Sequence, residues 1–400
     1  MLIVQKFGGT SVGNLERIEN VANRVSKTLK DGHSVVVVVS AMSGETNKLI
    51  EYTEYFTKTP DKQAMDFVVS SGERVTAGLL AIALNAKGHK AMAMSGRQAG
   101  IVTNNAFTTA RISDIDGNNM LGKLKEGNVI VVAGFQGITE DGVVTTLGRG
   151  GSDLTAVAIA GALKADLCEI YTDVDGVYTT DPRIEPKAKK LNVISYDEML
   201  ELASAGAKVL QNRSVELAKK LEVNLVTRSS FNENEGTLIT KENDMMENVL
   251  VSGIALDKNQ VAVTVRGVED RPGIAAEIFE TLSNEDIVVD MIVQNVGQDS
   301  KANISFTVPQ NELERVKVIM AKFAQAIVTY DSEVSKVSVV GVGMKSHSGI
   351  AAKAFTTLAK ENINILMIST SEIKISILIN EKYGELAVRA LHEAYELANR

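Results

Sequence analysis

Residues 2–11 read LIVQKFGGTS, and this stretch decides the fold of the first half of the chain. An aliphatic segment suited to a buried strand runs directly into two glycines and two hydroxyl residues. Gly8 and Gly9 have no Cβ, so their backbone N–H groups can approach a phosphate closely. The hydroxyl residues can cap a following helix, whose positive end favours anions, and Lys6 adds a point charge. An ordinary tight turn would explain the same letters, so the motif needs support from elsewhere.

That support comes from residues 146–153, TLGRGGSD, which form a second glycine-rich loop. The loop follows a probable strand at residues 142–146 and precedes an apolar helix. Three glycines surround Arg149, whose planar fork suits bidentate capture of a carboxylate or phosphate, while Ser152 and Asp153 stand at the helix start. Two such loops in one domain predict two anionic groups held face to face, although a purely structural origin of the second loop is the alternative.

One further motif is a decoy. Residues 117–124, GNNMLGKL, match the GxxxxGK part of a Walker A loop. Leu124 replaces the hydroxyl residue that would hold Mg²⁺, and no strand precedes the motif, so we predict a helix there. The HRD and DFG motifs of protein kinases are absent from the sequence.

Short aliphatic strands alternate with helical stretches from Met1 to about Phe231. This alternation predicts an α/β fold with a mostly parallel sheet sandwiched by helices. Ligands in such folds bind beyond the C-terminal ends of the strands, which is where both glycine-rich loops fall. The predicted strands are 2–6, 34–40, 129–134, 142–146, 169–172 and 224–227, and the predicted helices lie near 14–30, 61–86, 153–164 and 204–220.

Length and composition set further limits. At 400 residues, with 44% hydrophobic and 23% charged residues, the chain should fold throughout into more than one domain. A net charge of −8 argues against nucleic-acid binding. The single Cys168 lies in an apolar run and reads as a core residue rather than a nucleophile. The longest aliphatic run, Val35 to Val39, is far too short to span a bilayer, so we expect a cytoplasmic protein that is neither exported nor embedded in a membrane.

The C-terminal part contains an internal repeat. Residues 273–292 match residues 349–368 at an offset of 76, with 11 identities in 20 positions. Each copy reads strand, helix, strand, strand, helix, which indicates a ferredoxin-like βαββαβ unit that must pack on another. A duplicated dimerisation module without a ligand is the alternative. The predicted domains are a first domain at 1–231, a linker at 232–248, and two repeat units at 249–332 and 333–400.

Five motifs together resemble the aspartate kinases of the amino-acid kinase superfamily, and the duplicated tail resembles their paired ACT domains. The resemblance covers nearly all of the chain, and the first and fourth motifs are the most specific. The motifs are KFGGTSV at 6–12, SGER at 71–74, GRGGSD at 148–153, YTDVDGVYTTDPR at 171–183 and GAKVL at 206–210.

The resemblance implies transfer of the γ-phosphoryl group of ATP to the side-chain carboxylate of L-aspartate, giving 4-phospho-L-aspartate. This is the first step of lysine, threonine and methionine biosynthesis. Lys6 would neutralise the phosphoryl group in flight, assisted by the amides of Gly8 and Gly9, while Asp153 would position Lys6. A carboxylate is already a nucleophile, so no general base is required. Mg²⁺ should arrive with ATP, and no protein ligand is predicted for it.

The same resemblance implies two sets of binding residues. Arg149 and Ser152 would hold the α-carboxylate of aspartate, and Glu73 its ammonium group, although Glu73 could also be a solvated residue of its helix. The remaining substrate residues are Ser40, Thr46, Phe135, Gly150 and Gly151. The ATP-binding residues are Lys6, Phe7, Gly8, Gly9, Thr172, Asp173, Tyr178, Arg183, Lys208 and Val209; the last lysine could equally be a simple surface residue.

The paired ACT units imply feedback inhibition by lysine, threonine or both, and a homo-oligomer that forms through these units. Met245 and Met246 stand where a separately started small subunit begins in some relatives. The implied effector residues are Asp270, Arg271, Pro272, Gly273, Ile274, Ala275, Val288, Val289, Asp290, Gln294, Ile350, Ala351, Asn364, Ile365, Ser371 and Glu372. Two other functions stay open: another amino-acid kinase, acting on glutamate, a nucleoside monophosphate or carbamate, and a catalytically silent amino-acid sensor.

Overall fold

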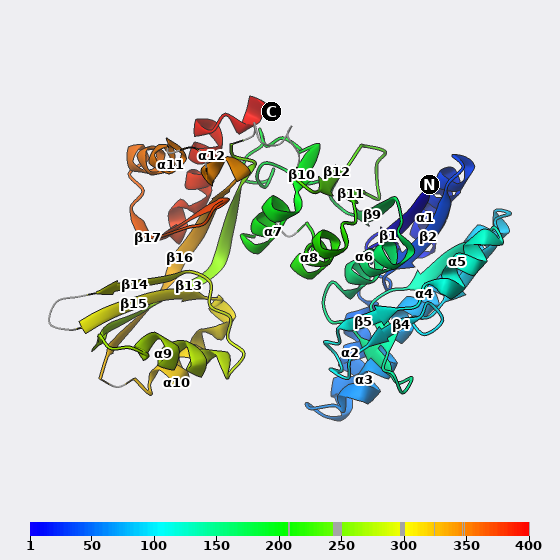
Figure 1. Cartoon of the computed structure of the whole chain (residues 1–400), viewed down its shortest axis with the longest axis horizontal. Coiled ribbons are helices and arrows are strands. Elements are labelled where there is room, and N and C mark those ends of the chain that lie inside the picture. The colour runs from blue at the N-terminus through cyan, green and yellow to red at the C-terminus, as the bar shows by residue number, and fades with distance from the viewer. Residues whose placement is uncertain are drawn as a thin grey trace. The chain divides into compact units, whose positions relative to one another are not determined.

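The computed structural model divides the chain into two compact units (Figure 1). Unit 1 comprises Met1–Val177, Lys190–Ala203 and Lys208–Asn243, and unit 2 comprises the remainder. The structure describes the chain except residues 207–208, 243–249, 297–300, 324, 346, 348 and 400, and it describes no side chain at 296, 343 and 345. Lys208, Met245 and Met246 therefore lie outside the described residues.

The centre of unit 1 is an eight-stranded sheet in the order β10-β12-β11-β9-β1-β2-β6-β3. Every pairing in it is parallel except that of β11 with β12, which confirms the predicted sheet. The strands are β1 (Leu2–Phe7), β2 (Ser34–Val39), β3 (Ala91–Met94), β6 (Val129–Ala133), β9 (Leu167–Thr172), β10 (Val193–Ser195), β11 (Leu225–Ser229) and β12 (Thr237–Thr240).

Strand β2 shows why the sheet is covered on both faces. Val35 to Val39 are all fully buried, as expected for a central parallel strand with helices above and below it. On one face, Val35, Val37 and Val39 pack in a core with α1 (Leu15–Lys30) and α4 (Ser71–Ala86). On the other, α6 (Gly151–Leu163) packs against β1, β2 and β9, and Cys168 is buried as predicted.

The helix predicted at 61–86 exists as α3 (Lys62–Val69) and α4, with the change at Ser70. By length and composition alone residues 62–86 could cross a membrane, but half of their most apolar window is buried within the protein. Phe67, Val75 and Ile82 are exposed. The decoy motif is helical, as predicted, in α5 (Asn118–Lys125). The helix predicted near 204–220 is wrong at its start, because α7 (Tyr196–Ser204) precedes it and α8 spans only Asn212–Leu221.

A small second sheet in unit 1, ordered β5-β4-β7-β8, brings the second glycine-rich loop toward the main sheet. Its last strand ends at Thr146, just before that loop. The strands are β4 (Ile101–Thr103), β5 (Ile112–Ile115), β7 (Gln136–Ile138) and β8 (Val144–Thr146). Neither this sheet, apart from β8, nor helix α2 (Glu45–Phe56) was predicted.

Two segments depart from the predicted domain boundaries. The predicted linker at 232–248 contains β12, which pairs with β10 and β11 and so belongs to the main sheet. Conversely, residues Tyr178–Lys189 cluster with unit 2. There the carbonyl of Thr179 accepts a bond from Ile254 N–H at 2.7 Å, and its hydroxyl lies 2.9 Å from Nε2 of the buried His392.

Unit 2 contains one continuous sheet in the order β14-β15-β13-β16-β18-β17, with all pairings antiparallel. Its strands are β13 (Gly253–Glu269), β14 (Ile292–Val296), β15 (Lys301–Val308), β16 (Ile327–Val340), β17 (Ile365–Thr370) and β18 (Lys374–Asn380). Its α-helices are α9 (Ile274–Ser283), α10 (Leu313–Met320), α11 (Gly349–Lys360) and α12 (Gly384–Ala394).

The two repeats share their long strands, which the predicted boundary at 332/333 missed. The second half of β13, from Val261 onward, belongs to one hydrophobic core, whereas Ile254 belongs to the other together with α11 and α12. Residues Gly253 to Asp257 pair with Lys336 to Val340 and supply the strand that the second repeat lacks at its own C-terminal end. The second ferredoxin-like unit is therefore complete only because the segment before the first repeat supplies its last strand.

Candidate functional site

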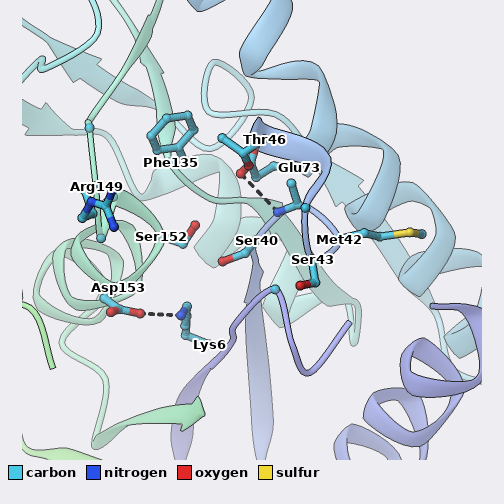
Figure 2. Close-up of a pocket in the computed structure, with 16 residues that line it drawn as sticks. Lys6, Ser40, Met42, Ser43, Thr46, Glu73, Phe135, Arg149, Ser152 and Asp153 are labelled. Atoms are coloured by element: carbon cyan, nitrogen blue, oxygen red, sulfur yellow. Dashed lines mark hydrogen bonds and ion pairs between the residues drawn. The ribbon is translucent and has the colours of Figure 1, made fainter. Parts of the chain in front are cut away.

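A pocket of about 280 Å³ lies in unit 1 beyond the C-terminal ends of the central strands (Figure 2). It contains both glycine-rich loops, so the predicted convergence of Lys6 and Arg149 on one site is confirmed. The lining residues are Lys6, Gly9, Ser40, Ala41, Met42, Ser43, Gly44, Thr46, Glu73, Phe135, Gly148, Arg149, Gly150, Gly151, Ser152 and Asp153.

Lys6 and Asp153 form an ion pair on the floor of this pocket (Figure 2). Lys6 Nζ lies 2.5 Å from Asp153 Oδ1, and the two side chains are only 10% and 13% exposed. Asp153 stands in the first turn of α6, where the helix dipole also favours a negative charge. The lysine ammonium is thus held at a fixed point beside the helix N-terminus instead of moving freely in solvent.

Arg149 lies on the same side of the pocket as Asp153, in the turn that opens α6, and Glu73 lies across from it (Figure 2). Gly150 has φ 73°, and a Cβ on it would lie 2.2 Å from Gln211 Cγ, so both conformation and packing require glycine. A Cβ on Gly151 would lie 2.8 Å from the Phe135 ring. Arg149 is exposed and makes no ion pair with any other described residue, so its guanidinium can bind an anionic ligand.

Glu73 is the buried acid of the pocket. It is only 3% exposed, which rules out a solvated position on its helix. One oxygen, Oε1, accepts a bond from the backbone N–H of Ala41 at 3.1 Å, while Oε2 has no hydrogen-bond partner within the described structure. Burial raises the pKa of Glu73 to about 7. An unpaired, desolvated carboxylate of this kind is suited to a cationic ligand.

Besides Gly148, which belongs to the second glycine-rich loop, four lining residues were not predicted: Ala41, Met42, Ser43 and Gly44. They form the turn between β2 and α2, and Gly44, with φ 83°, is the residue before the helix. No side chain caps the first N–H groups of α2 or of α6, so two helix N-termini open at this pocket. The run of small residues SAMSGET after a predicted strand was the available signal for this turn.

The predicted nucleotide residues next to the first loop are only partly available. Phe7 is fully buried and stacks on Tyr171 at 4.5 Å between ring centroids, so its side chain cannot contact ATP. The Gly8 N–H donates to the Tyr171 carbonyl at 3.3 Å and is not free for a phosphate; a Cβ on Gly8 would lie 3.4 Å from Lys6 Nζ. Of the first glycine-rich loop, Lys6 and Gly9 line the pocket, whereas Phe7 and Gly8 do not.

Thr172 and Asp173 lie where predicted, at the C-terminal end of β9 next to β1. The Thr172 carbonyl accepts a bond from the Ser230 N–H at 2.9 Å. The Ser230 hydroxyl in turn lies 2.5 Å from that of Ser11, which joins this strand end to the first glycine-rich loop.

The other predicted nucleotide residues are more widely distributed. Tyr178 and Arg183 belong to the segment that clusters with unit 2, and Arg183 forms a bidentate ion pair with Asp181. Val209 lies in the turn before α8, half-buried.

The predicted effector residues occupy both halves of unit 2. Ile274 and Ile350 are buried in two different hydrophobic cores, so these two side chains do not line one common pocket. Gly273, with φ 99°, precedes α9, whose first N–H groups have no side-chain cap. Asp290 pairs with the buried Lys336. Val288 is largely exposed.

Comparison with known proteins agrees with the geometry. Residues 1–227 match the model of the amino acid kinase family, and residues 261–323 and 337–395 match that of the ACT domain. The chain is 60% identical to an aspartokinase of Helicobacter pylori strain J99, over 99% of this chain and 100% of that relative.

Solved structures give the same result. The chain resembles E. coli aspartokinase III in complex with aspartate and ADP, with a TM-score of 0.81 and 26% identity over 98% of this chain and 99% of that one. The complex of the same enzyme with lysine and aspartate gives a TM-score of 0.78 and 27% identity over 98% and 99%. With its two glycine-rich loops meeting in one pocket and its duplicated tail, the chain belongs to the aspartokinases of the amino acid kinase family.

Proposed function

We infer that this enzyme transfers the γ-phosphoryl group of ATP to the side-chain carboxylate of L-aspartate. The observation that carries this conclusion is the charge pattern of the pocket, in which Arg149 and Lys6 face the unpaired buried carboxylate of Glu73. A ligand that satisfies all three carries two anionic groups and one cation. The α-carboxylate of aspartate, its ammonium group and the transferring phosphoryl group supply these three, and the side-chain carboxylate is left free to attack. The identity to aspartokinases supports the assignment.

We propose specific roles for the substrate-binding residues. Arg149 and Ser152 hold the α-carboxylate at the N-terminus of α6, where the helix dipole adds to the attraction. Glu73 holds the ammonium group, which supplies the missing partner of Oε2. Ser40, Thr46, Phe135 and the glycines at 150 and 151 shape the rest of the pocket. A volume of about 280 Å³ suits a small amino acid.

Catalysis then rests on positioning and charge neutralisation. The attacking carboxylate is already ionised, so no general base is needed. Lys6, fixed by Asp153, neutralises charge on the phosphoryl group as it moves between ATP and aspartate. Gly9 and Gly44, the residue before α2, line the same pocket.

The nucleotide is proposed to bind at the C-terminal ends of β1 and β9, beside Gly9, Thr172 and Asp173. Val209, also in unit 1, completes the proposed set. No group of three or more His, Cys, Asp or Glu suited to a metal ion occurs in the part of the chain that the structure describes. Mg²⁺ is proposed to enter with the ATP phosphates and to keep several waters, because this ion is usually bound through one or two carboxylates and the substrate phosphates.

We further propose feedback inhibition through unit 2 by lysine, threonine or both. Two segments of unit 2 match the ACT-domain family, and E. coli aspartokinase III forms a complex with lysine. Both observations support a regulatory ligand. The ligand's carboxylate would bind at the uncapped N-terminus of α9. The enzyme is proposed to form a homo-oligomer through these domains, with or without a small subunit started internally, and to act in the cytoplasm.

A direct test measures ADP release from ATP with L-aspartate, with glutamate, with carbamate, with a nucleoside monophosphate and with no acceptor, and traps the acyl phosphate with hydroxylamine. Only aspartate should give both ADP and the hydroxamate. Repeating the assay with lysine, with threonine and with both identifies the effector. Equal turnover with glutamate would favour another amino-acid kinase, and no aspartate-dependent turnover would favour a silent sensor.

A further inference from the structure

Asp66 is a buried acid that does not line the substrate pocket. It connects the wall of the pocket that carries Glu73 to the wall that carries Arg149. It stands in α3 and is only 1% exposed. Its Oδ2 accepts bonds from the backbone N–H groups of Thr108 and Thr146, each at 2.9 Å, and its Oδ1 accepts one from the Thr146 hydroxyl at 2.6 Å. A buried carboxylate with three donors is a strong local tie.

On one side, this tie holds the Arg149 loop. Thr146 is the last residue of β8, directly before the loop that carries Arg149. The Thr108 carbonyl lies 3.2 Å from where a Cβ on Gly148 would stand, so the Thr108 turn backs the start of the same loop. Thr108 has φ 70°, which is unfavourable for a β-branched residue and persists only when the surroundings fix it.

On the other side, Asp66 is rigidly connected to Glu73. Helix α3 passes through Ser70 directly into α4, and Glu73 lies in the first turn of α4. A second buried tie lies close by, because Gln136 Nε2 donates to the Ser70 carbonyl at 2.8 Å, and Gln136 follows the pocket residue Phe135. The helical segment that carries Glu73 is thus bonded twice, through Asp66 and through the Ser70 carbonyl, to the small sheet whose last strand leads to Arg149.

We propose that Asp66 is a positioning residue for aspartate binding: its carboxylate fixes the gap between Glu73 and Arg149. The inference rests on the proposed function, since it assumes that these two side chains grip one amino acid. The gap must match the short distance between the ammonium and carboxylate groups of that ligand, so a loosened tie weakens both contacts together. The proposed ATP contacts on β1 and β9 are not bonded to Asp66 and should be unaffected.

Two substitutions separate the effect of the hydrogen bonds of Asp66 from the effect of its negative charge. Asp66→Ala leaves two buried N–H donors and a hydroxyl without their acceptor, and should raise the KM for aspartate by about tenfold or more. Asp66→Asn keeps the shape; its amide oxygen can accept both N–H bonds, and its amide group can donate to the Thr146 oxygen. Its KM should stay within about threefold of the natural enzyme.

The matched control is Asp61→Ala, at the residue directly before the same helix. Asp61 caps α3 by accepting a bond from the Ala64 N–H at 2.8 Å and touches neither wall of the pocket. Its loss destabilises the helix by about 1 kcal/mol, a cap's ordinary contribution. A general loss of stability reduces the amount of active enzyme, hence the apparent kcat, without raising the KM for aspartate selectively.

The experiment measures the KM for aspartate and for ATP in all four proteins. A selective rise in the aspartate KM in Asp66→Ala alone supports the proposal. An unchanged aspartate KM in Asp66→Ala, or an equal rise in Asp61→Ala, overturns it. Should Asp66→Ala not fold, Thr146→Val removes one of the three bonds, and an aspartate KM unchanged from the natural enzyme then overturns the proposal, whereas a rise of about three- to fivefold supports it. Absence of aspartate-dependent ADP release in the natural enzyme would instead refute the proposed function.

Discussion

Replacing Glu73 with glutamine should make the enzyme more stable at alkaline pH and much weaker in binding aspartate. Burial raises the pKa of this carboxyl from 4.5 to about 7, because the ionised form loses water. The Ala41 N–H, its own backbone N–H and the charge of Arg74 offset this loss only in part. The folded state therefore holds the proton more tightly than the unfolded chain does. The resulting loss of stability is absent below pH 4.5, grows as pH rises to 7, and is complete above pH 7.

The magnitude follows from this difference in pKa, which corresponds to about 3 kcal/mol at pH 8. Glutamine removes the ionisation but places an amide where Oε2 has no partner among the described residues, which costs about 1 kcal/mol. The net expectation is a gain of about 2 kcal/mol at pH 8 and no gain at pH 5. Urea unfolding at the two pH values, following the transition of the kinase domain, measures it.

The same substitution should remove the partner of the substrate ammonium. A lost charged contact in a buried site costs about 3 kcal/mol, or roughly a hundredfold in kcat/KM for aspartate. In the natural enzyme kcat/KM for aspartate should rise with pH through about 7 and level off above it, as Glu73 ionises, whereas in Glu73→Gln that rise should vanish. Glu54→Gln, on the exposed surface of α2, is the matched control and should change neither property.

The reasoning about Glu73 fails if Glu73→Gln is less stable than the natural enzyme at pH 8, since burial would then not strain the carboxylate. It also fails if kcat/KM for aspartate stays within about threefold. Gain of stability together with loss of binding is the combination that identifies a site strained for function.

Three other predictions address the remaining parts of the enzyme. Lys6→Ala should lose on the order of 3 kcal/mol or more of transition-state stabilisation, seen as a fall in kcat of at least about a hundredfold; unchanged turnover would remove Lys6 from the mechanism. Arg149→Lys cannot make a bidentate contact, so the aspartate KM should rise about tenfold while the ATP KM holds; an equal rise in both would place Arg149 elsewhere. Deleting residues 249–400 should abolish inhibition by lysine or threonine in the ADP-release assay, and retained inhibition would put the effector site in the kinase domain.

The sequence predicted the main sheet because local patterns suffice for it. Consecutive aliphatic residues such as Val35 to Val39 can be buried on both faces only in a covered parallel sheet. Once the sheet is parallel, all loops after its strands open at the same edge. The place of Lys6 at that edge was therefore predictable, whereas the Arg149 loop follows β8 of the small second sheet and reaches the same pocket only through tertiary packing.

The sequence could not show how buried each side chain would be. Glu73 lies on a helix whose letters allow an exposed or an inward position, and only the packing of α4 against the sheet decided between them. Phe7 was predicted to contact the nucleotide because Lys6 and Gly8 beside it were predicted to do so. The alternation of side chains along the strand instead directs its ring into the core, against Tyr171. Neighbours in a strand point to opposite faces, so a motif's letters do not share one environment.

Long-range pairing decided the rest. The repeat established two similar units, but the second has no final strand of its own, and only the folded sheet shows Gly253 to Asp257 supplying it. Likewise, the role of Asp66 depends on Thr108 and Thr146, which are 42 and 80 residues away along the chain. Local spacing determines which strands and helices form, because it acts through neighbouring residues. Which of them become partners depends on the burial of whole faces, and this is settled only when distant segments pack together.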